Sequence, residues 1–323
     1  MLTVCGRPTG KPTALVRGGE KVTSAADFPW HVTIYDRTRR MEQICGGSLI
    51  TPKFFVSAAH CFHDDKKAQP ASRFVAVFAK TKRTATISEP NTQQRTVKSI
   101  HLHEQYGARK LHFANDIALA ELVEEVEMTA WTLPVCVDWA LDHPELSLGE
   151  KGMVVGFGSV PGQPSEDLRY ALLPYIPKDT CRKNVPNVLA IFSEQSDKFC
   201  VGYVDGKTVS TGDSGGGMSF PSERQWFLRG VVSVGSPKDT TYSFYTNVTA
   251  FVPWMSGIIR QGEVSGRRCG VDVDDVSVVD GNRPENNGFP WEVDIYIKKT
   301  SGTLFQRSWT GVLISPNLVL TGK

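Results

Sequence analysis

The sequence predicts an all-β protein built from short antiparallel strands. Segments rich in valine, isoleucine and aromatic residues recur between turns, a composition typical of strands. Their spacing is that of antiparallel barrels and sandwiches rather than of alternating strands and helices. The clearest of these segments are residues 30–35, 73–78, 152–157 and 228–234.

One helix is predicted near the end of this strand-rich region. Pro253 fits the first turn of a helix, where its missing N–H is tolerated. Four apolar residues then fall on one helical face: Trp254, Met255, Ile258 and Ile259. A polar stretch containing glycine, from Gly262 to Arg268, follows and is typical of a linker. We therefore expect a helix over 252–260 with a boundary after it.

Composition excludes several classes of protein. The 323 residues are 40% hydrophobic and 22% charged, which is typical of a soluble globular protein of one large domain, or of one domain and part of another. A net charge of +2 favours neither a nucleic acid nor an anionic membrane as a partner. No apolar run approaches the ~20 residues that span a bilayer. We expect no cofactor, and a monomeric domain.

The seven cysteines indicate an oxidising compartment. None of them forms a Cys-x-x-Cys pair, which would favour zinc or thiol chemistry. Cys45 and Cys61 bracket one short segment, and Cys181 and Cys200 bracket another, as disulfides do in extracellular proteins. The first residues lack the features of a signal peptide. We therefore expect a secreted protein whose true start lies upstream.

Three motifs, in this order along the chain, predict nucleophilic chemistry. Ser214 is the candidate nucleophile, His60 the base that takes its proton, and Asp116 the group that orients the base. Glycines beside the serine let the backbone turn and direct N–H groups towards a developing oxyanion. By itself the serine motif is more typical of a plain turn, and a lone histidine beside a cysteine is more typical of a packed or surface residue. All three motifs in order favour a triad. The motifs are Ser57-Ala58-Ala59-His60-Cys61, Asn115-Asp116-Ile117-Ala118-Leu119 and Gly212-Asp213-Ser214-Gly215-Gly216.

Other histidines carry a weaker signal. His101 and His103 alternate on an expected strand and could bind a metal in principle. No acidic residue or cysteine is spaced with them as a further ligand, so a surface strand is the favoured interpretation. We predict no metal site.

The start of the sequence recurs near its end, which indicates an internal repeat at the scale of a domain. The second copy stops at Lys323, just before the position that would match His60, and about 50 residues cannot close a barrel. We expect this tail to be disordered or to belong to a longer protein, and favour the second. Cys269 then has no obvious partner. The matched segments are Cys5-Gly6 with Cys269-Gly270, Phe28-Pro29-Trp30 with Phe289-Pro290-Trp291, Ile34-Tyr35 with Ile295-Tyr296, and Leu49-Ile50-Thr51-Pro52 with Leu313-Ile314-Ser315-Pro316.

Together with Cys45-Gly46-Gly47-Ser48-Leu49-Ile50, the three motifs resemble those of the trypsin/chymotrypsin family of serine peptidases. The resemblance implies two six-stranded antiparallel β-barrels with the active site between them and a C-terminal helix. It also implies that the N–H groups of Gly212 and Ser214 form the oxyanion hole. The expected layout is the end of a light chain with its activation segment at 1–15, a peptidase domain at 16–262, a linker at 263–276, and the truncated start of a second protease-like domain at 277–323.

The same resemblance implies activation by cleavage. In the family, a new N-terminal amine pairs with the aspartate before the nucleophile, here Asp213. Val16 is the expected new N-terminus, although Arg17 departs from the two aliphatic residues that usually stand there. The bond cut would follow Leu15. A disulfide between Cys5 and Cys136 would then keep the light-chain fragment attached.

The substrate pocket is the main departure from the family. The position at the pocket floor falls near Thr208, where trypsin-like enzymes carry an aspartate, and binding a cation there without a partner would be costly. We therefore predict cleavage after apolar residues, with self-activation after Leu15 as a hypothesis. Ser210 stands where most members of the family have one cysteine of a pocket disulfide. Two interpretations are open: local packing compensates for the missing disulfide, or the substrate orders the pocket. The expected pocket residues are Thr208, Ser233, Gly235 and Ser243.

The block from Gly206 to Met218 is most similar to arthropod modular serine proteases and the horseshoe-crab clotting factor C type. This similarity implies an extracellular innate-immune or clotting cascade, with protein substrates that include downstream zymogens. The alternative is a non-catalytic protease homologue acting as a regulatory binding scaffold. The second repeat favours that alternative, because Trp309 replaces the cysteine matching Cys45, and Gly322 and Lys323 replace two alanines.

Overall fold

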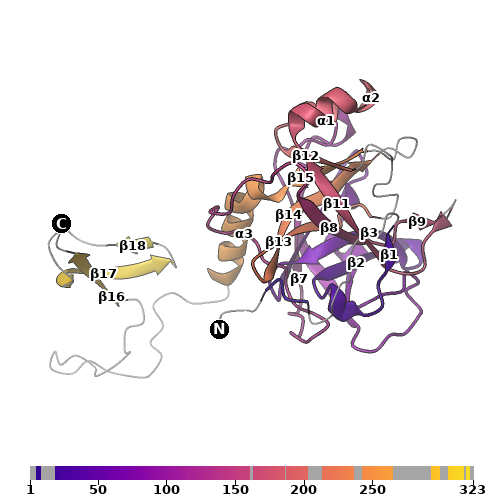
Figure 1. Cartoon of the computed structure of the whole chain (residues 1–323). Helices are drawn as coiled ribbons and strands as arrows, with labels where there is room; N and C mark the ends of the chain where they lie inside the picture. The colour runs from indigo at the N-terminus through magenta and orange to yellow at the C-terminus, as the bar shows by residue number, and fades with distance from the viewer. Residues whose placement is uncertain are drawn as a thin grey trace. The chain divides into compact units, whose positions relative to one another are not determined.

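The structure is a computed structural model that describes residues 5–8, 19–160, 163–185, 187–202, 213–235, 242–264, 292–298, 305–315 and 318–320. The chain divides into two compact units, Met1–Gly257 and Ile258–Lys323 (Figure 1). Within the described segments, no helix combines the length and the apolar character needed to cross a membrane.

Six antiparallel strands close the first barrel, in the order β2-β3-β4-β7-β6-β5. Their pairing buries apolar side chains from every strand, including Val32, Leu49 and Leu119. Strand β4 ends just before His60, and β7 begins just after Asp116. The strands are β2 (His31–Asp36), β3 (Glu42–Leu49), β4 (Phe54–Ser57), β5 (Phe74–Phe78), β6 (Gln93–Leu102) and β7 (Ala118–Leu122).

The second barrel also has six antiparallel strands, and pairing of β8 with both β11 and β13 closes it. Its core contains eight buried side chains, Val154, Leu173, Phe199, Val201, Met218, Phe220, Val232 and Tyr245. Strand β1 (Glu20–Lys21) adds to β11, and β9 (Ser159–Val160) pairs with β10 (Gln163–Pro164). The barrel strands are β8 (Lys151–Gly156), β11 (Arg169–Ile176), β12 (Lys198–Gly202), β13 (Gly217–Ser222), β14 (Gln225–Gly235) and β15 (Tyr242–Asn247).

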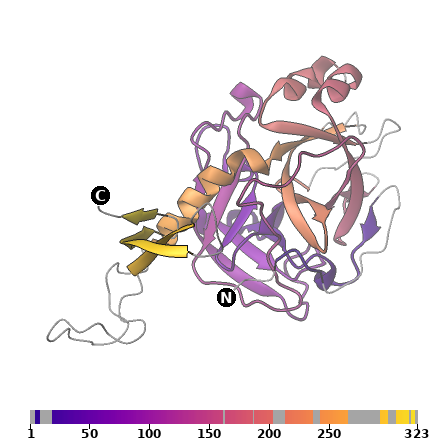
Figure 2. The same ribbon diagram turned by 60° about the vertical axis from the view of Figure 1, so that its left-hand side comes forward.

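Two short helices, α1 (Lys178–Asn184) and α2 (Asn187–Glu194), lie side by side at the edge of the second barrel, before β12 (Figure 2). The predicted C-terminal helix is present as α3 (Val252–Val264). It continues past Gly262, so the stretch that was predicted to be a linker from that residue is helical as far as Val264. A glycine inside a helix costs only about 1 kcal/mol relative to alanine and need not end it. Short 3-10 turns lie at Ala25–Asp27, Arg37–Arg39, Ala59–Phe62, Ala71–Arg73, Arg109–Leu111 and Val248–Phe251.

These observations confirm the predicted fold class: two six-stranded antiparallel barrels followed by a helix. The three expected disulfides are also present, Cys5–Cys136, Cys45–Cys61 and Cys181–Cys200. Cys269 lies outside the described residues.

The second unit contains a three-stranded antiparallel sheet of β16 (Glu292–Lys298), β17 (Phe305–Ser315) and β18 (Leu318–Leu320). Its pairing repeats that of β2, β3 and β4. Val32 pairs with Gly47 and Val293 with Gly311, and each pair of strands shifts register at an Ile-Tyr step, after Ile34 and after Ile295. The repeat seen in the sequence therefore extends to strand register, and the expectation of a disordered tail does not hold for these strands.

Candidate active site

Strand pairing in the first barrel brings two of the candidate triad residues together. His60 lies in the turn Ala59–Phe62, directly after β4, and Asp116 lies two residues before β7. Strands β4 and β7 are antiparallel neighbours, with Ser57 opposite Ala118. The end of one strand and the start of the other therefore lie at the same edge of the barrel, and so do the residues beside them.

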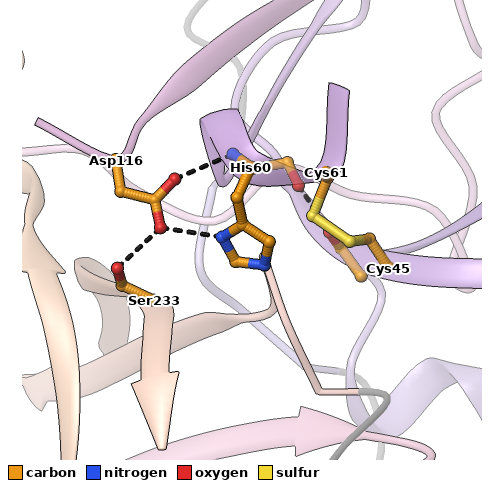
Figure 3. The surroundings of a disulfide bond; sticks show 7 residues. Cys45, His60, Cys61, Asp116 and Ser233 are labelled. Carbon is orange, nitrogen blue, oxygen red and sulfur yellow. Dashed lines mark hydrogen bonds and ion pairs between the residues drawn. A yellow bond between two sulfur atoms is a disulfide. The ribbon is translucent and has the colours of Figure 1, made fainter. Parts of the chain in front are cut away.

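The imidazole of His60 is held by the carboxylate of Asp116 (Figure 3). His60 Nδ1 lies 2.8 Å from Asp116 Oδ2, and the backbone N–H of His60 donates to Asp116 Oδ1 at 2.9 Å. Two contacts fix both the position of the turn and the orientation of the ring. Because Nδ1 faces the carboxylate, Nε2 is the ring nitrogen left to accept a proton from a nucleophile.

Asp116 has no exposed surface, so its charge depends on donors around it. Ser233, on β14 of the second barrel, donates its hydroxyl hydrogen to Asp116 Oδ2 at 2.6 Å. Thr246, on β15, donates to the backbone carbonyl of Asp116 at 2.9 Å. The second barrel therefore completes the surroundings of a residue that the first barrel supplies.

The electrostatic balance favours a charged Asp116 beside a basic His60. Burial raises the pKa of Asp116, but attraction to His60, its hydrogen bond and the positive charge of Lys198 outweigh burial and lower that pKa overall. Burial lowers the pKa of His60, whereas the charge and hydrogen bond of Asp116 raise it, and the net direction is upward. The carboxylate thus stays ionised and stabilises a proton on the imidazole when one arrives.

Ser214 is held against β3 through its backbone. The N–H of Gly46 donates to the carbonyl of Ser214 at 2.8 Å. The next residue, Gly215, has a φ of +75°, and a Cβ atom there would collide with Ser57 Oγ and lie 2.6 Å from the carbonyl oxygen of Gly46. Only glycine permits this close approach, which brings the serine segment to the residues just before His60.

The described residues leave the Ser214 amide available. Its N–H has no acceptor among them, whereas the N–H of Gly215 donates to Val232 and that of Gly216 to Asp213. An unused N–H at this position suits an oxyanion. No hydrogen bond between Ser214 and His60 is formed within the described part of the chain. Such bonds are often long before substrate binds.

A disulfide and an aromatic ring flank His60. Cys61 follows it in sequence, and the Cys45–Cys61 bond ties the turn to β3, next to Gly46 (Figure 3). On another side, the ring of Phe113 packs edge-on against the imidazole at 5.9 Å between ring centres. The disulfide therefore links the histidine turn to the strand that holds Ser214.

Asp213 is buried, and its Oδ1 accepts the N–H of Gly158 at 2.8 Å. A Cβ atom on Gly156 would collide with that same oxygen, so glycine is required beside the carboxylate. Near the start of the chain, the segment around Cys5 is also fastened. Gly6 donates its N–H to the carbonyl of Pro134 and accepts the N–H of Trp226, next to the Cys5–Cys136 disulfide.

The predicted pocket residues are described only in part. Gly235, at the exposed end of β14, pairs with the fully buried Ser243 on β15. Ser233 lies on the same strand, but its hydroxyl is directed to Asp116 (Figure 3). The remaining predicted positions lie outside the described residues: Val16, Thr208, Ser210 and Gly212.

Among the residues that the structure describes, two groups of side chains have the composition of metal ligands. One contains His60 with Cys45 and Cys61, whose sulfur atoms are used in the disulfide. The other is Asp138, Asp142 and His143, in which the Asp138 carboxylate accepts the N–H groups of the other two residues and thus caps a turn. His101 bonds Ser99, and His103 packs on Phe251 and Trp254, so those two rings do not form a shared site.

Sequence reasoning missed three features of the site: Ser233 as a donor to Asp116, Phe113 beside His60, and a buried lysine, Lys198, whose charge acts on both His60 and Asp116. Phe113 stands only three residues before Asp116, so its closeness in the sequence could have indicated that it lies near the site. The lysine gave none, because a charged residue at the start of a strand is usually exposed.

Two antiparallel six-stranded barrels that meet at a histidine, a buried aspartate and a glycine-flanked serine define the chymotrypsin-like class of proteins. Sequence comparison agrees with the structure, since the model of the family described as Trypsin matches residues 16–255. The chain belongs to the trypsin family.

Individual relatives include clotting proteases of two animal groups. Clotting factor C of Tachypleus tridentatus is 30% identical over 275 residues, covering 80% of this chain and 27% of that protein. Limulus clotting factor C of Carcinoscorpius rotundicauda matches to the same extent. Coagulation factor IX of Cavia porcellus is 31% identical over 245 residues, covering 74% of this chain and 80% of that protein. The chain thus spans about a quarter of the length of the clotting factor C relatives it matches.

Proposed function

We propose that this protein is a secreted serine endopeptidase that is made as a zymogen and cleaves through an acyl-enzyme. The observation that carries the proposal is the pair of hydrogen bonds between His60 and the buried Asp116, next to a Ser214 backbone fastened at Gly46. This is the arrangement that converts a serine hydroxyl into a nucleophile at neutral pH.

In the proposed mechanism each step has its own atom. Ser214 Oγ attacks the carbonyl carbon of the substrate while His60 Nε2 takes the hydroxyl proton. The resulting oxyanion would be stabilised by the N–H of Ser214, which has no acceptor within the described part of the chain, together with that of Gly212. Collapse of the intermediate expels the amine, to which the imidazolium returns the proton, and water then releases the acyl group by the same route. Asp116 keeps the imidazole oriented throughout and stabilises its charged form.

Activation is proposed to follow cleavage after Leu15. The new amine of Val16 would pair with Asp213, whose carboxylate is buried beside Gly156 and Gly158 and is a fitting acceptor for a cation. Because Asp213 directly precedes Ser214, this pairing would order the oxyanion hole.

The proposed substrates are proteins cut after apolar residues. Support comes from the uncharged Thr208 at the expected pocket floor, and from the apolar residue at the chain's own activation bond. The relatives named as clotting factors support a place in an extracellular clotting or immune cascade, and three disulfides fit secretion.

One observation favours a second candidate, a regulatory scaffold without catalysis. The strands β16 to β18 repeat β2 to β4 in register. Trp309 pairs with Ile295 in the second copy, at the position where Cys45 pairs with Ile34 in the first. In this second candidate, both protease-like copies would serve for binding rather than catalysis.

An active-site probe separates the two candidates. Protein cleaved before Val16 is treated with a fluorophosphonate, which forms a covalent bond only with an activated serine. We expect labelling of the wild type that Ser214→Ala abolishes and that Ser219→Ala, a matched change of a buried serine on β13, preserves. Absence of labelling in folded, cleaved wild type would support the scaffold.

A further inference from the structure

A buried ion pair lies behind the candidate triad. Lys198 has a side chain with no exposed surface, and its Nζ lies 2.8 Å from Asp197 Oδ2. Lysine is almost never fully buried without a partner, because removing its charge from water is costly. The position of this pair therefore calls for an explanation.

The pair is connected to both sides of Asp116. Asp197 Oδ2 accepts the backbone N–H of Asn115 at 2.7 Å. Lys198 Nζ lies 3.4 Å from Thr246 Oγ1, which in turn donates to the carbonyl of Asp116 at 2.9 Å. The ion pair thus contacts the residue before Asp116 directly and Asp116 itself through one hydroxyl.

Strand register places these groups. Lys198 begins β12 and pairs with Thr246 on β15, so both side chains belong to the second barrel. Asn115 and Asp116 belong to the loop that leads into β7 of the first barrel. The buried lysine therefore brings a positive charge from one barrel to the carboxylate supplied by the other.

The charges around His60 come from three elements. After burial and the dominant effect of Asp116, Lys198 lowers the pKa of His60, whereas Asp65, in the loop after the histidine turn, raises it. Lys198 also lowers the pKa of Asp116, whose negative charge adds to burial in raising the pKa of Tyr106. A fixed cation at this place opposes addition of a proton to the imidazole.

We propose that Lys198, held by Asp197 and Thr246, is a positioning residue that keeps His60 unprotonated and Asp116 ionised under mildly acidic conditions. Its catalytic meaning rests on the proposed function, because only a peptidase needs a neutral His60 to accept the serine proton. The alternative is that the pair only stabilises packing, in which case apolar replacements would leave the proton equilibrium of His60 unchanged.

Opposite charge changes at the pair test the proposal. Lys198→Met removes the cation and leaves Asp197 negative, so we expect half-protonation of His60 at a pH higher by about half a unit or more. Asp197→Asn leaves the cation uncompensated while keeping an acceptor for Asn115, and moves the midpoint the other way. A variant that only loosens packing would not produce shifts of opposite sign.

The measurement is an NMR titration of the His60 Cε1 signal in the full chain, assigned with His60→Gln. The matched control is Lys80→Met, which removes another buried lysine, paired with Glu89 at 3.2 Å, that is not among the charges acting on His60. We expect no shift in this control. Equal midpoints in all variants, or shifts in the same direction for both changes at the pair, would overturn the proposal.

A double variant covers the case in which a single change prevents folding. Asp197→Asn with Lys198→Met removes both charges at once, and its His60 midpoint should lie between those of the wild type and Lys198→Met; a midpoint below that of the wild type would overturn the proposal. The acid limb of kcat/KM is then compared with the NMR midpoint. If the two variants shift the NMR midpoint in opposite directions but the protein hydrolyses no substrate, the proposed function is wrong, whereas the effect of Lys198 on His60 is confirmed.

Discussion

Asp116 shows how the chain keeps a fully buried carboxylate charged. Its Oδ1 accepts the N–H of His60, its Oδ2 faces His60 Nδ1 and the Ser233 hydroxyl, and its backbone carbonyl accepts from Thr246. An ionised carboxylate without such partners would be strongly disfavoured in the interior. Each donor also restricts the orientation of the carboxylate, and hence that of the imidazole it holds.

Removing one donor should therefore reduce activity more than stability. In Ser233→Ala, Asp116 Oδ2 loses a 2.6 Å bond from a buried hydroxyl, a charge-assisted bond worth about 1.5–3 kcal/mol. We expect kcat/KM on a peptide with an apolar residue before the cut bond to fall by about tenfold to a hundredfold. Ser219→Ala on the neighbouring strand is the control and should leave kcat/KM unchanged; equal losses in both would show that Ser233 acts only through packing.

His31 is the residue that should make stability depend on pH. It is buried, its Nε2 has no partner among the described residues, and burial lowers its pKa from 6.5 to about 4. Between these values the unfolded chain binds a proton that the folded chain does not. Stability contributed by the neutral ring is thus complete above pH 6.5 and decreases, by about 3 kcal/mol, as pH falls to 4.

The prediction is checked by urea unfolding of the wild type and His31→Gln across that range. We expect the variant, which cannot titrate at this position, to lose less stability between pH 6.5 and 4. His112→Gln changes an exposed histidine and should retain the wild-type slope. Parallel slopes for the wild type and His31→Gln would contradict the assignment.

At the scale of elements, the Cys45–Cys61 disulfide fastens the histidine turn to β3, whose Gly46 holds the carbonyl of Ser214. Changing both cysteines to alanine removes a disulfide between residues 16 positions apart, and should lower the free energy of unfolding by about 3 kcal/mol. Because the freed turn carries His60, we also expect a large fall in kcat at a temperature where the variant is folded.

The Cys181–Cys200 disulfide provides a matched control, since it spans 19 residues. Its removal should cost a similar amount of stability on the chain-entropy account. It constrains α1 against β12 rather than the histidine turn, so kcat should fall much less. Calorimetry and initial rates measure the two effects separately, and equal losses of kcat in both double variants would refute the special role of Cys45–Cys61.

The elements also show which features were predictable. Alternating strand segments and α3 follow from local composition, and the motifs around His60, Asp116 and Ser214 placed a site at element ends. Closure of the barrels needed the family resemblance, because local patterns do not determine which distant strands pair. Lys198 was not predictable, because its burial depends on pairing of β12 with β15 and on Asp197 beside it.

At the scale of the first unit, the site exists only when both barrels are folded and packed. The first barrel supplies His60 and Asp116, and the second supplies Ser214, Ser233 and Lys198. Hydrogen bonds from Ser233 and Thr246 to Asp116 cross between them. The triad prediction from sequence was therefore a statement about tertiary structure, and its support came from the order of the motifs rather than from any one of them.

The N-terminal segment gives a test of zymogen activation in the whole molecule. Cys5 is bonded to Cys136, and Gly6 donates to the carbonyl of Pro134 and accepts the N–H of Trp226, so the segment is attached at a point before the proposed cleavage after Leu15. Activated protein should therefore run as one species on a non-reducing gel, and only reduction should release the fragment 1–15.

The double variant Cys5→Ser with Cys136→Ser supplies the control. Once cleaved, it should lose the fragment without reduction, because the two backbone hydrogen bonds of Gly6 and the one from the Gln225 side chain to the carbonyl of residue 5, each worth about 0.5–1.5 kcal/mol, cannot retain a 15-residue peptide against its gain in conformational entropy. Mass spectrometry of the remaining chain should give Val16 as its first residue. A fragment that separates from cleaved wild type without reductant, or a chain that begins elsewhere, would show that activation does not use this bond.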